Sequence, residues 1–256
     1  MEPENLEVLT LNEENIADEH ICCGLADKKI AEGYRLKKEL IKSRLSEGFK
    51  FKKFNVRGKV FIEYVPAENA WSPIDAPGYM FIRCFWVSGR YKGHGFGTKL
   101  LDECINDAER EDKNGIVVVT SRKVMPFLTD KGFFIKKGFE VCDTAPPYFE
   151  LLVKKLKEAP LPKFRDDAKK AAVENKNGLT FIYSDLCPFT DYWVDKMIEF
   201  ANDLGIPSEK IKITTKEEAQ NIPSATALFS VYYNGEFLTH KIVAHKEFSK
   251  LLTKHM

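Results

Sequence analysis

The residues best suited to chemistry are four glycines in the segment 89–97. Glycine lacks a Cβ atom, so a glycine-rich backbone can approach a ligand closely and turn successive N–H groups toward one point. An apolar segment precedes this run and an amphipathic one follows it, so a helix N-terminus would add its partial positive charge. Arg90 and Lys92 add formal charge. The run predicts an anion site suited to a pyrophosphate.

Two better-known phosphate motifs do not fit this run. The spacing Gly93-x-Gly95-x-Gly97 differs from the dinucleotide fingerprint, and the Gly-Lys-Ser/Thr ending of a P-loop is missing. A glycine-rich turn with a purely structural role is the simpler alternative.

A different family signature is matched. Arg90-x-x-Gly93-x-Gly95 resembles the Gln/Arg-x-x-Gly-x-Gly/Ala signature of the GNAT superfamily of N-acetyltransferases, and the run 127–139 resembles its helix and Gly-Phe turn. The resemblance covers roughly residues 50–156. It implies an N-acetyltransferase that uses acetyl-CoA as cosubstrate, with a central strand splayed from its neighbour. The implied cofactor-binding residues are Phe85, Trp86, Val87, Arg90, Tyr91, Lys92, Gly93, His94, Gly95, Phe96, Gly97 and Thr98.

Acyl transfer to an amine needs a proton acceptor for the amine and often a proton donor for the departing thiolate. Many family members place a tyrosine donor where this chain has Phe134, which cannot donate a proton. Cys142 and Tyr148 are the candidate donors, and Glu63 and Glu68 are the candidate bases. The alternatives are a thiolate that leaves without an acid, and a domain that binds CoA without transfer. A solvated carboxylate is the simpler interpretation of either glutamate.

Three further features could belong to an acceptor pocket. Arg83 stands inside an otherwise apolar strand, where a buried arginine needs a carboxylate partner unless it points to an exposed face. Trp71 and Trp86 could line the pocket, and the adjacent thiols of Cys22-Cys23 could lie near it. Core packing is the simpler interpretation of both pairs. The expected acceptor is an amine-bearing small molecule or peptide.

A second chemical candidate is Cys187, which lies between a predicted strand and a predicted helix. A helix N-terminus lowers the pKa of a thiol. The element order resembles a thioredoxin-like fold, and the run 231–237 resembles the YoaP-like domain that follows some bacterial GNAT domains. Thr190 stands where a second cysteine would be, and the position of the usual cis-proline falls near Ala227. Without these two features we expect a structural or substrate-presenting domain, and the alternative is a redox role for Cys187 in a CoA- or small-thiol-binding, redox-sensing protein.

These residues must be positioned by an α/β protein with two domains. The expected parts are a mixed-sheet GNAT domain at 1–158, a linker at 159–178 and a smaller thioredoxin-like domain at 179–256. Hydrophobic periodicity and turn residues predict the elements. The expected helices are 16–32, 34–47, 98–110, 124–131, 166–174, a helix ending at 203, 216–221 and 245–254, and the expected strands are 51–56, 59–65, 79–87, 116–120, 138–142, 148–156, 179–183, 211–214, 225–233 and 236–243. The apolar strand 79–87 is expected to be central.

The composition narrows the class of protein. With 39 lysines and arginines against 38 aspartates and glutamates, the net charge of +1 provides no field to attract nucleic acid or a membrane. No apolar run approaches the ~20 residues of a membrane span, and residues 1–5 do not resemble a secretion signal. We expect a cytoplasmic protein with six reduced cysteines and no metal site. A homodimer stays open.

Overall fold

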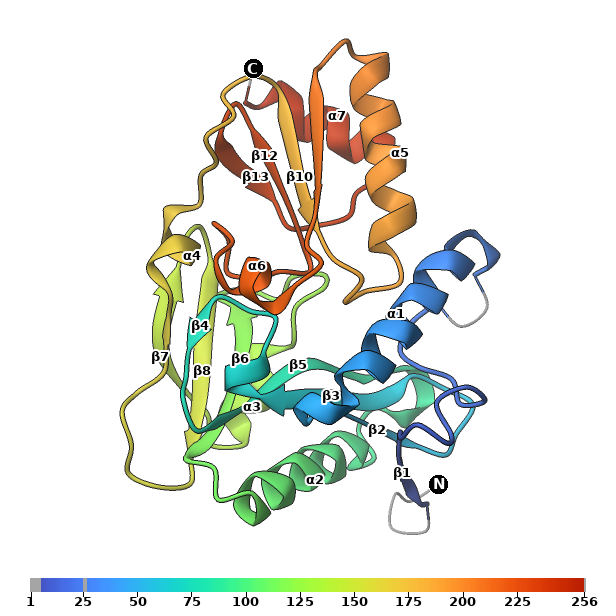
Figure 1. Cartoon of the computed structure of the whole chain (residues 1–256), viewed down its shortest axis with the longest axis vertical. Helices are drawn as coiled ribbons and strands as arrows, with labels where there is room; N and C mark the ends of the chain where they lie inside the picture. Colours follow the sequence, from blue (N-terminus) through green and yellow to red (C-terminus); the bar gives the residue numbers. More distant parts are fainter. Residues whose placement is uncertain (1–5, 25–26, 256) are drawn as a thin grey trace.

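The structure is a computed structural model that describes residues 6–24 and 27–255 (Figure 1). Residues 1–5, which were not expected to begin a secretion signal, lie outside the described residues, and so do residues 25–26 of the predicted helix 16–32. Within the described ranges, no helix has the length and apolar character needed to cross a bilayer.

A seven-stranded mixed sheet forms the first domain, in the order β1-β2-β3-β5-β6-β8-β7. β5, the predicted central strand, is the fourth of the seven. The strands are β1 (Val8–Thr10), β2 (Lys50–Phe54), β3 (Val60–Pro66), β5 (Tyr79–Val87), β6 (Gly115–Ser121), β7 (Glu140–Ala145) and β8 (Phe149–Lys155). The strands predicted for this sheet are confirmed, 79–87 without change and the others with shifts of one to three residues at their ends, while the short β1 was missed.

Helices cover both faces of this sheet. α2 (Phe96–Arg110) packs the predicted apolar stripe, with Leu100, Leu101 and Cys104, against the buried residues of β3 and β5. On the other face lie α1 (Ala31–Arg44) and the second domain (Figure 1). α3 (Lys131–Lys136) is the remaining helix of this part, and 3-10 turns occupy Lys28–Ile30, Leu45–Glu47, Ala67–Asn69 and Gly89–Tyr91.

Two helix predictions were wrong. Gly33 does not separate two helices, because α1 runs through it and residues 16–24 form turns instead. A Cβ atom at Gly33 would lie 2.2 Å from the carbonyl oxygen of Pro188, so glycine is needed there for close packing of the second domain. The predicted helix 124–131 is a loop, and the helix begins only at Lys131, where Asp130 caps its N-terminus.

The central strands separate near their ends, which opens the sheet. β5 pairs with β6 in parallel from Tyr79 to Ile82, and the pairing stops there although β5 continues to Val87. β6 continues to Ser121 beside β8 instead. The splayed strand implied by the family resemblance is therefore present, and the β5 backbone beyond Ile82 has no strand on that side.

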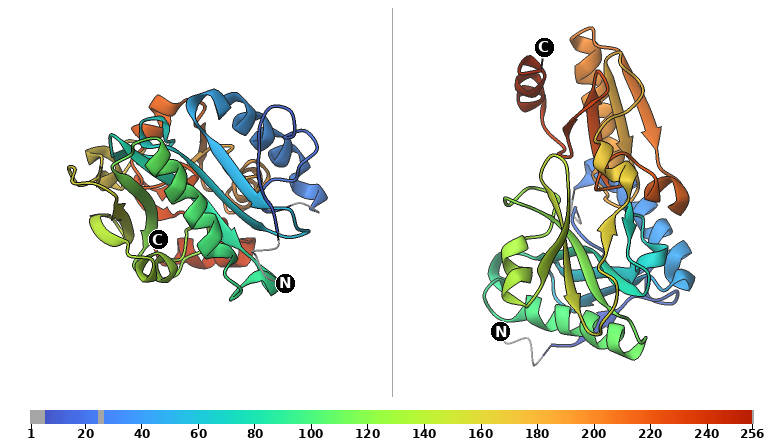
Figure 2. Two further views of the ribbon diagram at one scale, coloured as in Figure 1. Left: turned by 90° about the horizontal axis from the view of Figure 1, so that it is seen from below. Right: turned by 90° about the vertical axis from the view of Figure 1, so that its left-hand side faces the viewer.

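The second domain holds a four-stranded sheet in the order β11-β10-β12-β13, at the end of the molecule opposite α2 (Figure 2). β10 pairs in parallel with β11 and antiparallel with β12, and the predicted turn at Asn234-Gly235 joins β12 to β13 with positive φ at both residues. The elements are β10 (Leu179–Tyr183), α5 (Thr190–Asp203), β11 (Ser208–Lys212), α6 (Lys216–Gln220), β12 (Phe229–Tyr233), β13 (Glu236–Thr239) and α7 (His245–Thr253).

The segment 159–178 connects the domains and packs against both, since Ala171 and Val173 form backbone hydrogen bonds with Phe237 and Gly235 of the second domain. β9 (Lys163–Phe164) pairs with β4 (Ile74–Asp75), and α4 (Asp166–Lys170) follows, with Phe164 and Ala168 fully buried.

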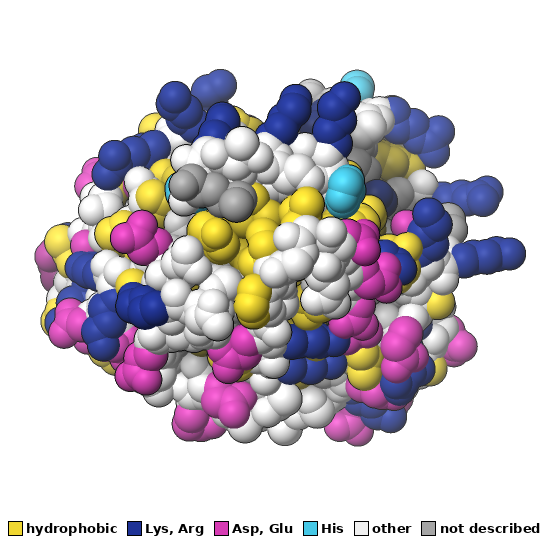
Figure 3. Space-filling model, turned by 90° about the horizontal axis from the view of Figure 1, so that it is seen from above, with side chains coloured by type: hydrophobic (Ala, Val, Ile, Leu, Met, Phe, Trp, Pro, Cys, Tyr) yellow, Lys and Arg dark blue, Asp and Glu magenta, His cyan; other side chains and the backbone are white. Residues whose placement is uncertain are grey.

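Seen from the end that carries the second domain, basic and acidic side chains both surround an apolar area (Figure 3). The apolar core continues across the junction, since Ala225 belongs to the core that includes Phe61 and Phe81.

Candidate active site

A cavity of about 1110 Å³ lies where β5 and β6 separate, and both domains line it. The first domain contributes β5, the glycine loop and the loop 124–130. The second domain contributes two loops, 186–189 and 225–228. The cavity is therefore a product of domain docking as well as of the first fold.

The glycine loop forms one end of this cavity. Gly93 and Gly95 have φ of 80° and 82°, a conformation that favours glycine, and a Cβ at Gly93 would meet nothing within 4 Å. α2 begins directly afterwards at Phe96, so its first N–H groups have no acceptor within the helix. Lys59 and Lys92 also line the cavity. Open backbone amides, a helix N-terminus and lysines fit a pyrophosphate.

Most residues predicted to bind the cofactor lie on this wall. The lining residues among them are Phe85, Trp86, Val87, Tyr91, Lys92, Gly93, Gly95, Phe96, Gly97 and Thr98. Arg90 and His94 do not line it. Arg90 instead lies over the Tyr91 ring, with its guanidinium carbon 5.2 Å from the ring centroid, and donates to the Tyr91 hydroxyl at 3.1 Å. Tyr91 packs edge-on against Phe96, which supports the loop from beneath.

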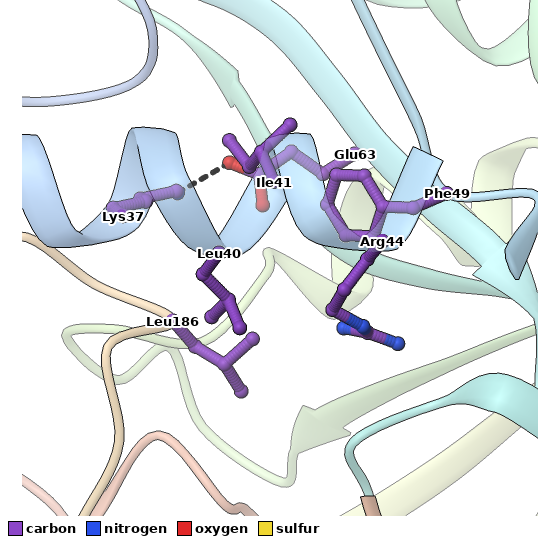
Figure 4. Close-up of a pocket in the computed structure, with 7 residues that line it drawn as sticks. All are labelled: Lys37, Leu40, Ile41, Arg44, Phe49, Glu63 and Leu186. Atoms are coloured by element: carbon purple, nitrogen blue, oxygen red, sulfur yellow. Dashed lines mark hydrogen bonds and ion pairs between the residues drawn. The ribbon is translucent and has the colours of Figure 1, made fainter. Parts of the chain in front are cut away.

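A buried cluster of charges forms the wall at the other end. Lys37 Nζ donates to Glu63 Oε1 at 2.5 Å, and Arg83 Nε donates to Glu63 Oε2 at 2.6 Å. Figure 4 shows Lys37 of α1 pointing at Glu63 of β3. The exposed fractions of the side chains are 3% for Lys37, 0% for Glu63 and 7% for Arg83. Arg83 thus has the carboxylate partner that its place in an apolar strand required.

A β-bulge explains how Arg83 reaches this cluster. Glu63 pairs with Cys84 and Tyr64 pairs with Ile82, so Arg83 is an extra residue without a partner on β3. A bulge of this kind changes the direction of side chains along the strand. Arg83 can therefore join Glu63 on the side that faces α1 and the second domain.

The interactions within this cluster favour the ionised form of each of its three side chains. Burial acts to raise the pKa of Glu63, but Arg83 and Lys37 lower it overall. Burial acts to lower the pKa of Lys37 and of Arg83, but neighbouring groups, Glu63 among them, raise both. All three side chains therefore stay ionised near neutral pH, and Glu63 is a weak proton acceptor.

The structure does not bring the four predicted catalytic residues together. Glu63 lies in the charge cluster, where Lys37 and Arg83 line the cavity and Glu63 does not. Glu68 accepts a hydrogen bond from the Gly78 amide, Cys142 donates to the Leu151 carbonyl, and the Tyr148 hydroxyl contacts His240 Nδ1 at 2.5 Å. Burial raises the pKa of Cys142 and of Tyr148 to about 12. None of the four is among the residues lining the cavity. Their catalytic role stays a prediction that these positions do not support.

Phe134 occupies the position where many family members have tyrosine, and it is a core residue. It is fully buried and packs edge-on against Phe85, Phe133 and Phe139. A hydroxyl is absent from this place, and the aromatic cluster instead fixes Phe85 beneath the cavity.

Cys187 lines the cavity together with Cys22, Cys23 and Cys84. The adjacent thiols of Cys22-Cys23 thus lie at the site, although core packing was the simpler interpretation of their sequence. Burial raises the pKa of Cys187, although Lys37 and Arg83 act in the opposite direction. The lowering expected from a helix N-terminus is therefore outweighed by burial, and the thiol is the resting form near neutral pH.

Several lining residues were missed from the sequence. Lys37 was missed because a lysine on an amphipathic helix is normally exposed. Lys59 and the loops 186–189 and 225–228 were missed as well, since only domain docking brings those loops to the cavity. The helix position of Lys37 relative to Ile41, which is buried on the same face, is the one clue that the sequence offered.

Comparisons with known proteins show which families this chain resembles. A model of the acetyltransferase (GNAT) family matches residues 21–133, and a model of the YoaP-like family matches residues 207–250. The chain is 40% identical over 245 residues to the uncharacterized N-acetyltransferase YoaP of Bacillus subtilis (strain 168), covering 95% of this chain and 97% of that protein.

Solved structures with some likeness include two GNAT acetyltransferases. One is from Staphylococcus aureus Mu50, with a TM-score of 0.43 at 16% identity, covering 59% of this chain and 99% of that one. The other is from Brucella melitensis and was solved with acetyl-CoA, with a TM-score of 0.40 at 15% identity, covering 62% of this chain and 93% of that one.

Proposed function

The chain belongs to the GNAT family of N-acetyltransferases, and on that premise we propose that it moves an acetyl group from acetyl-CoA to an amine held between its two domains. Acetyl-CoA is the cosubstrate, and the amine belongs to a small molecule or a peptide. The glycine loop binds the diphosphate, and β5 runs beside the pantetheine arm.

The single observation that carries this proposal is the shared cavity. It joins the glycine loop at one end to Arg83, the thiols and the second domain at the other. A pyrophosphate at the loop would direct the acyl end along the free edge of β5 toward that second end. The acceptor then lies where both domains meet.

The chain supplies positioning more than proton transfer. Bound acetyl-CoA supplies the thioester. On its β6 side the β5 backbone beyond Ile82 is unpaired and offers N–H groups to polarise the thioester carbonyl, and the cavity aligns the amine for attack. The new N–C bond forms as the C–S bond breaks, the sulfur leaves with the electron pair, and the amine proton passes to solvent.

The test is a binding and transfer assay on the full chain. We expect acetyl-CoA and CoA to raise the melting temperature of the protein. We also expect one amine of a panel to gain about 42 mass units, the mass of an added acetyl group, while CoA thiol is released. Failure of both coenzymes to stabilise the protein contradicts the proposal. Stabilisation with thiol release but no acetylated amine indicates hydrolysis instead.

A second function is favoured by one observation, the presence of Cys187 on the same cavity wall. In that function Cys187 exchanges with CoA disulfide: its thiolate attacks one sulfur, a protein–CoA disulfide forms and CoA thiolate leaves. Because burial raises its pKa, the reaction should accelerate as pH rises. Mass spectrometry of the adduct, with Cys187→Ser as the control, tests this. An adduct that persists in the variant assigns the exchange to another thiol.

A further inference from the structure

We propose that the acceptor of this enzyme is an amine that also carries a carboxylate, and that Lys37 and Arg83 bind that carboxylate in the cavity wall. The inference rests on the proposed acetyl transfer and adds the substrate class. It starts from a surplus of buried positive charge beside the place where the acceptor would lie.

The cluster holds two cations and one anion. Glu63 takes one hydrogen bond from Lys37 and one from Arg83, so a single carboxylate faces two positive groups. Burying a charge without a partner is unfavourable, so the uncompensated charge stabilises an incoming anion. The thiols of Cys22, Cys23 and Cys84 do not supply that anion, because burial raises the pKa of each and keeps it protonated.

The donors needed to bind an anion are available. Arg83 uses Nε on Glu63, and among the described residues no acceptor contacts its two terminal nitrogens. Lys37 likewise has one acceptor, Glu63, for three protons. Both residues line the cavity although each side chain is more than nine-tenths buried. A guanidinium with two free nitrogens matches the two oxygens of a carboxylate.

This anion site is distinct from the phosphate end of the cavity. Arg83 precedes Val87 by four residues of extended strand, which is about 13 Å, and the glycine loop begins only beyond Val87. A diphosphate held at Gly93–Gly95 would therefore lie beyond the end of β5, whereas Arg83 lies within the strand.

The surroundings favour one anionic group on a largely apolar acceptor. Among the described lining residues, Asp130 is the only carboxylate, and it is exposed where it caps α3. The second domain lies opposite the cations, because Leu186 packs with Lys37 and Leu40 around a small void. Trp71, Phe81 and Leu186 line the cavity too. An amino acid with an apolar side chain combines these properties.

The experiment compares matched ligands on the CoA-saturated full chain. The probes are L-phenylalanine and L-phenylalaninamide, L-leucine and L-leucinamide, and L-alanine with L-alaninamide and 1-aminoethylphosphonate. We expect at least one acid to bind about tenfold more tightly than its amide, as one charge-assisted contact provides. The phosphonate shows whether any anionic oxygen group suffices. If no acid binds better than its amide, the inference is wrong.

Variants separate recognition from folding. Lys37→Met removes the surplus charge and should bring the acid-to-amide ratio close to one, with the affinity for acetyl-CoA unchanged. Lys42→Met, on an exposed position of the same helix, is the matched control and should keep the ratio. Should Lys37→Met not fold, Arg83→Lys keeps the charge without the two-nitrogen fork and should reduce the ratio. An unaltered ratio in the folded variants overturns the assignment.

Different results would contradict the carboxylate site and the acetyl transfer. If acetyl-CoA stabilises the protein and the amino acid amides are acetylated as efficiently as the amino acids, the carboxylate inference is wrong and acetyl transfer stands. If neither acetyl-CoA nor CoA stabilises the protein, the proposed function fails first.

Discussion

The two ends of the cavity are built in opposite ways. The phosphate end comes mainly from one segment, residues 85–98, and its binding groups are main-chain amides in an open loop, with Lys59 from outside the segment. The other end comes from α1, β3, β5 and two loops of the second domain, and its binding groups are buried side chains. A backbone site depends on local conformation, whereas a side-chain site depends on packing between distant segments.

The largest effect should come from Glu63→Gln. This change leaves Lys37 and Arg83 buried without a counter-charge, so we expect a loss of about 3–5 kcal/mol in the free energy of unfolding. Urea denaturation measures it. Because the folded pKa of Glu63 is lowered, its stabilisation is present above the unfolded value of 4.5 and is lost as pH falls below it. A loss under 1 kcal/mol would mean that the packed ion pairs are unimportant.

A pH effect should follow from His240, which joins the second domain to the cavity loop. Its Nδ1 contacts the Tyr148 hydroxyl and its Nε2 contacts the Pro126 carbonyl at 2.9 Å. Burial lowers the pKa of His240 to about 4, so the unfolded chain binds its proton first as pH falls below 6.5. Stability should drop by about 3 kcal/mol between pH 6.5 and 4.

The comparison for that prediction is His240→Gln. Denaturation of the variant at the same pH values should show a drop smaller by roughly that amount, about 3 kcal/mol. Equal drops in the two proteins would assign the acid sensitivity to other groups.

The backbone end is tested by Gly93→Leu. A side chain there strains a φ of 80° and occupies the space in front of the loop amides, so we expect about a 100-fold loss in kcat/KM for acetyl-CoA, about 2.7 kcal/mol. Gly205→Leu is the matched control, since Gly205 also has positive φ and open space around its Cβ position but lies outside the cavity. Equal losses of kcat/KM in both variants would remove the loop from the binding site.

The smallest effect should come from Gly33→Ala. Alanine favours a helix by about 1 kcal/mol, but its Cβ would lie 2.2 Å from the Pro188 carbonyl oxygen, so the loop carrying Cys187 must shift. We expect a severalfold rise in the KM of the acceptor, roughly 3- to 10-fold, with CoA affinity unchanged. Ser43→Ala, on an exposed position of α1, serves as the comparison. A rise in KM for CoA alone would contradict the docking argument.

Features that depend on neighbouring residues were predicted from the sequence, and features that depend on packing between distant segments were not. The strand 79–87, the amphipathic helix after it and the turn at Asn234-Gly235 were identified from apolar periodicity and turn chemistry. Arg83 was recognised as needing a partner, but the partner was not identified. The short pair β4 and β9 was missed, because its two-residue strands carry no periodic pattern.

The errors arose where distant segments decide local structure. Gly33 was taken as a helix break, but the Pro188 carbonyl packs against it and the helix continues. Cys187 was expected to have a lowered pKa from its helix, but burial against the first domain raises it. Cys142 and Tyr148 were candidate acids, but the Cys142 thiol donates to the Leu151 carbonyl and the Tyr148 hydroxyl contacts His240.

The sequence by itself determined the family, the glycine loop and the order of elements, because glycine spacing, apolar periodicity and turn residues act over a few neighbouring positions. Only the tertiary structure decided the composition of the second end of the cavity. A bulge at Arg83, a buried lysine on α1 and the docking of loops 186–189 and 225–228 place groups together that lie far apart in the chain. Burial and charge pairing among such groups depend on distances that no local pattern encodes.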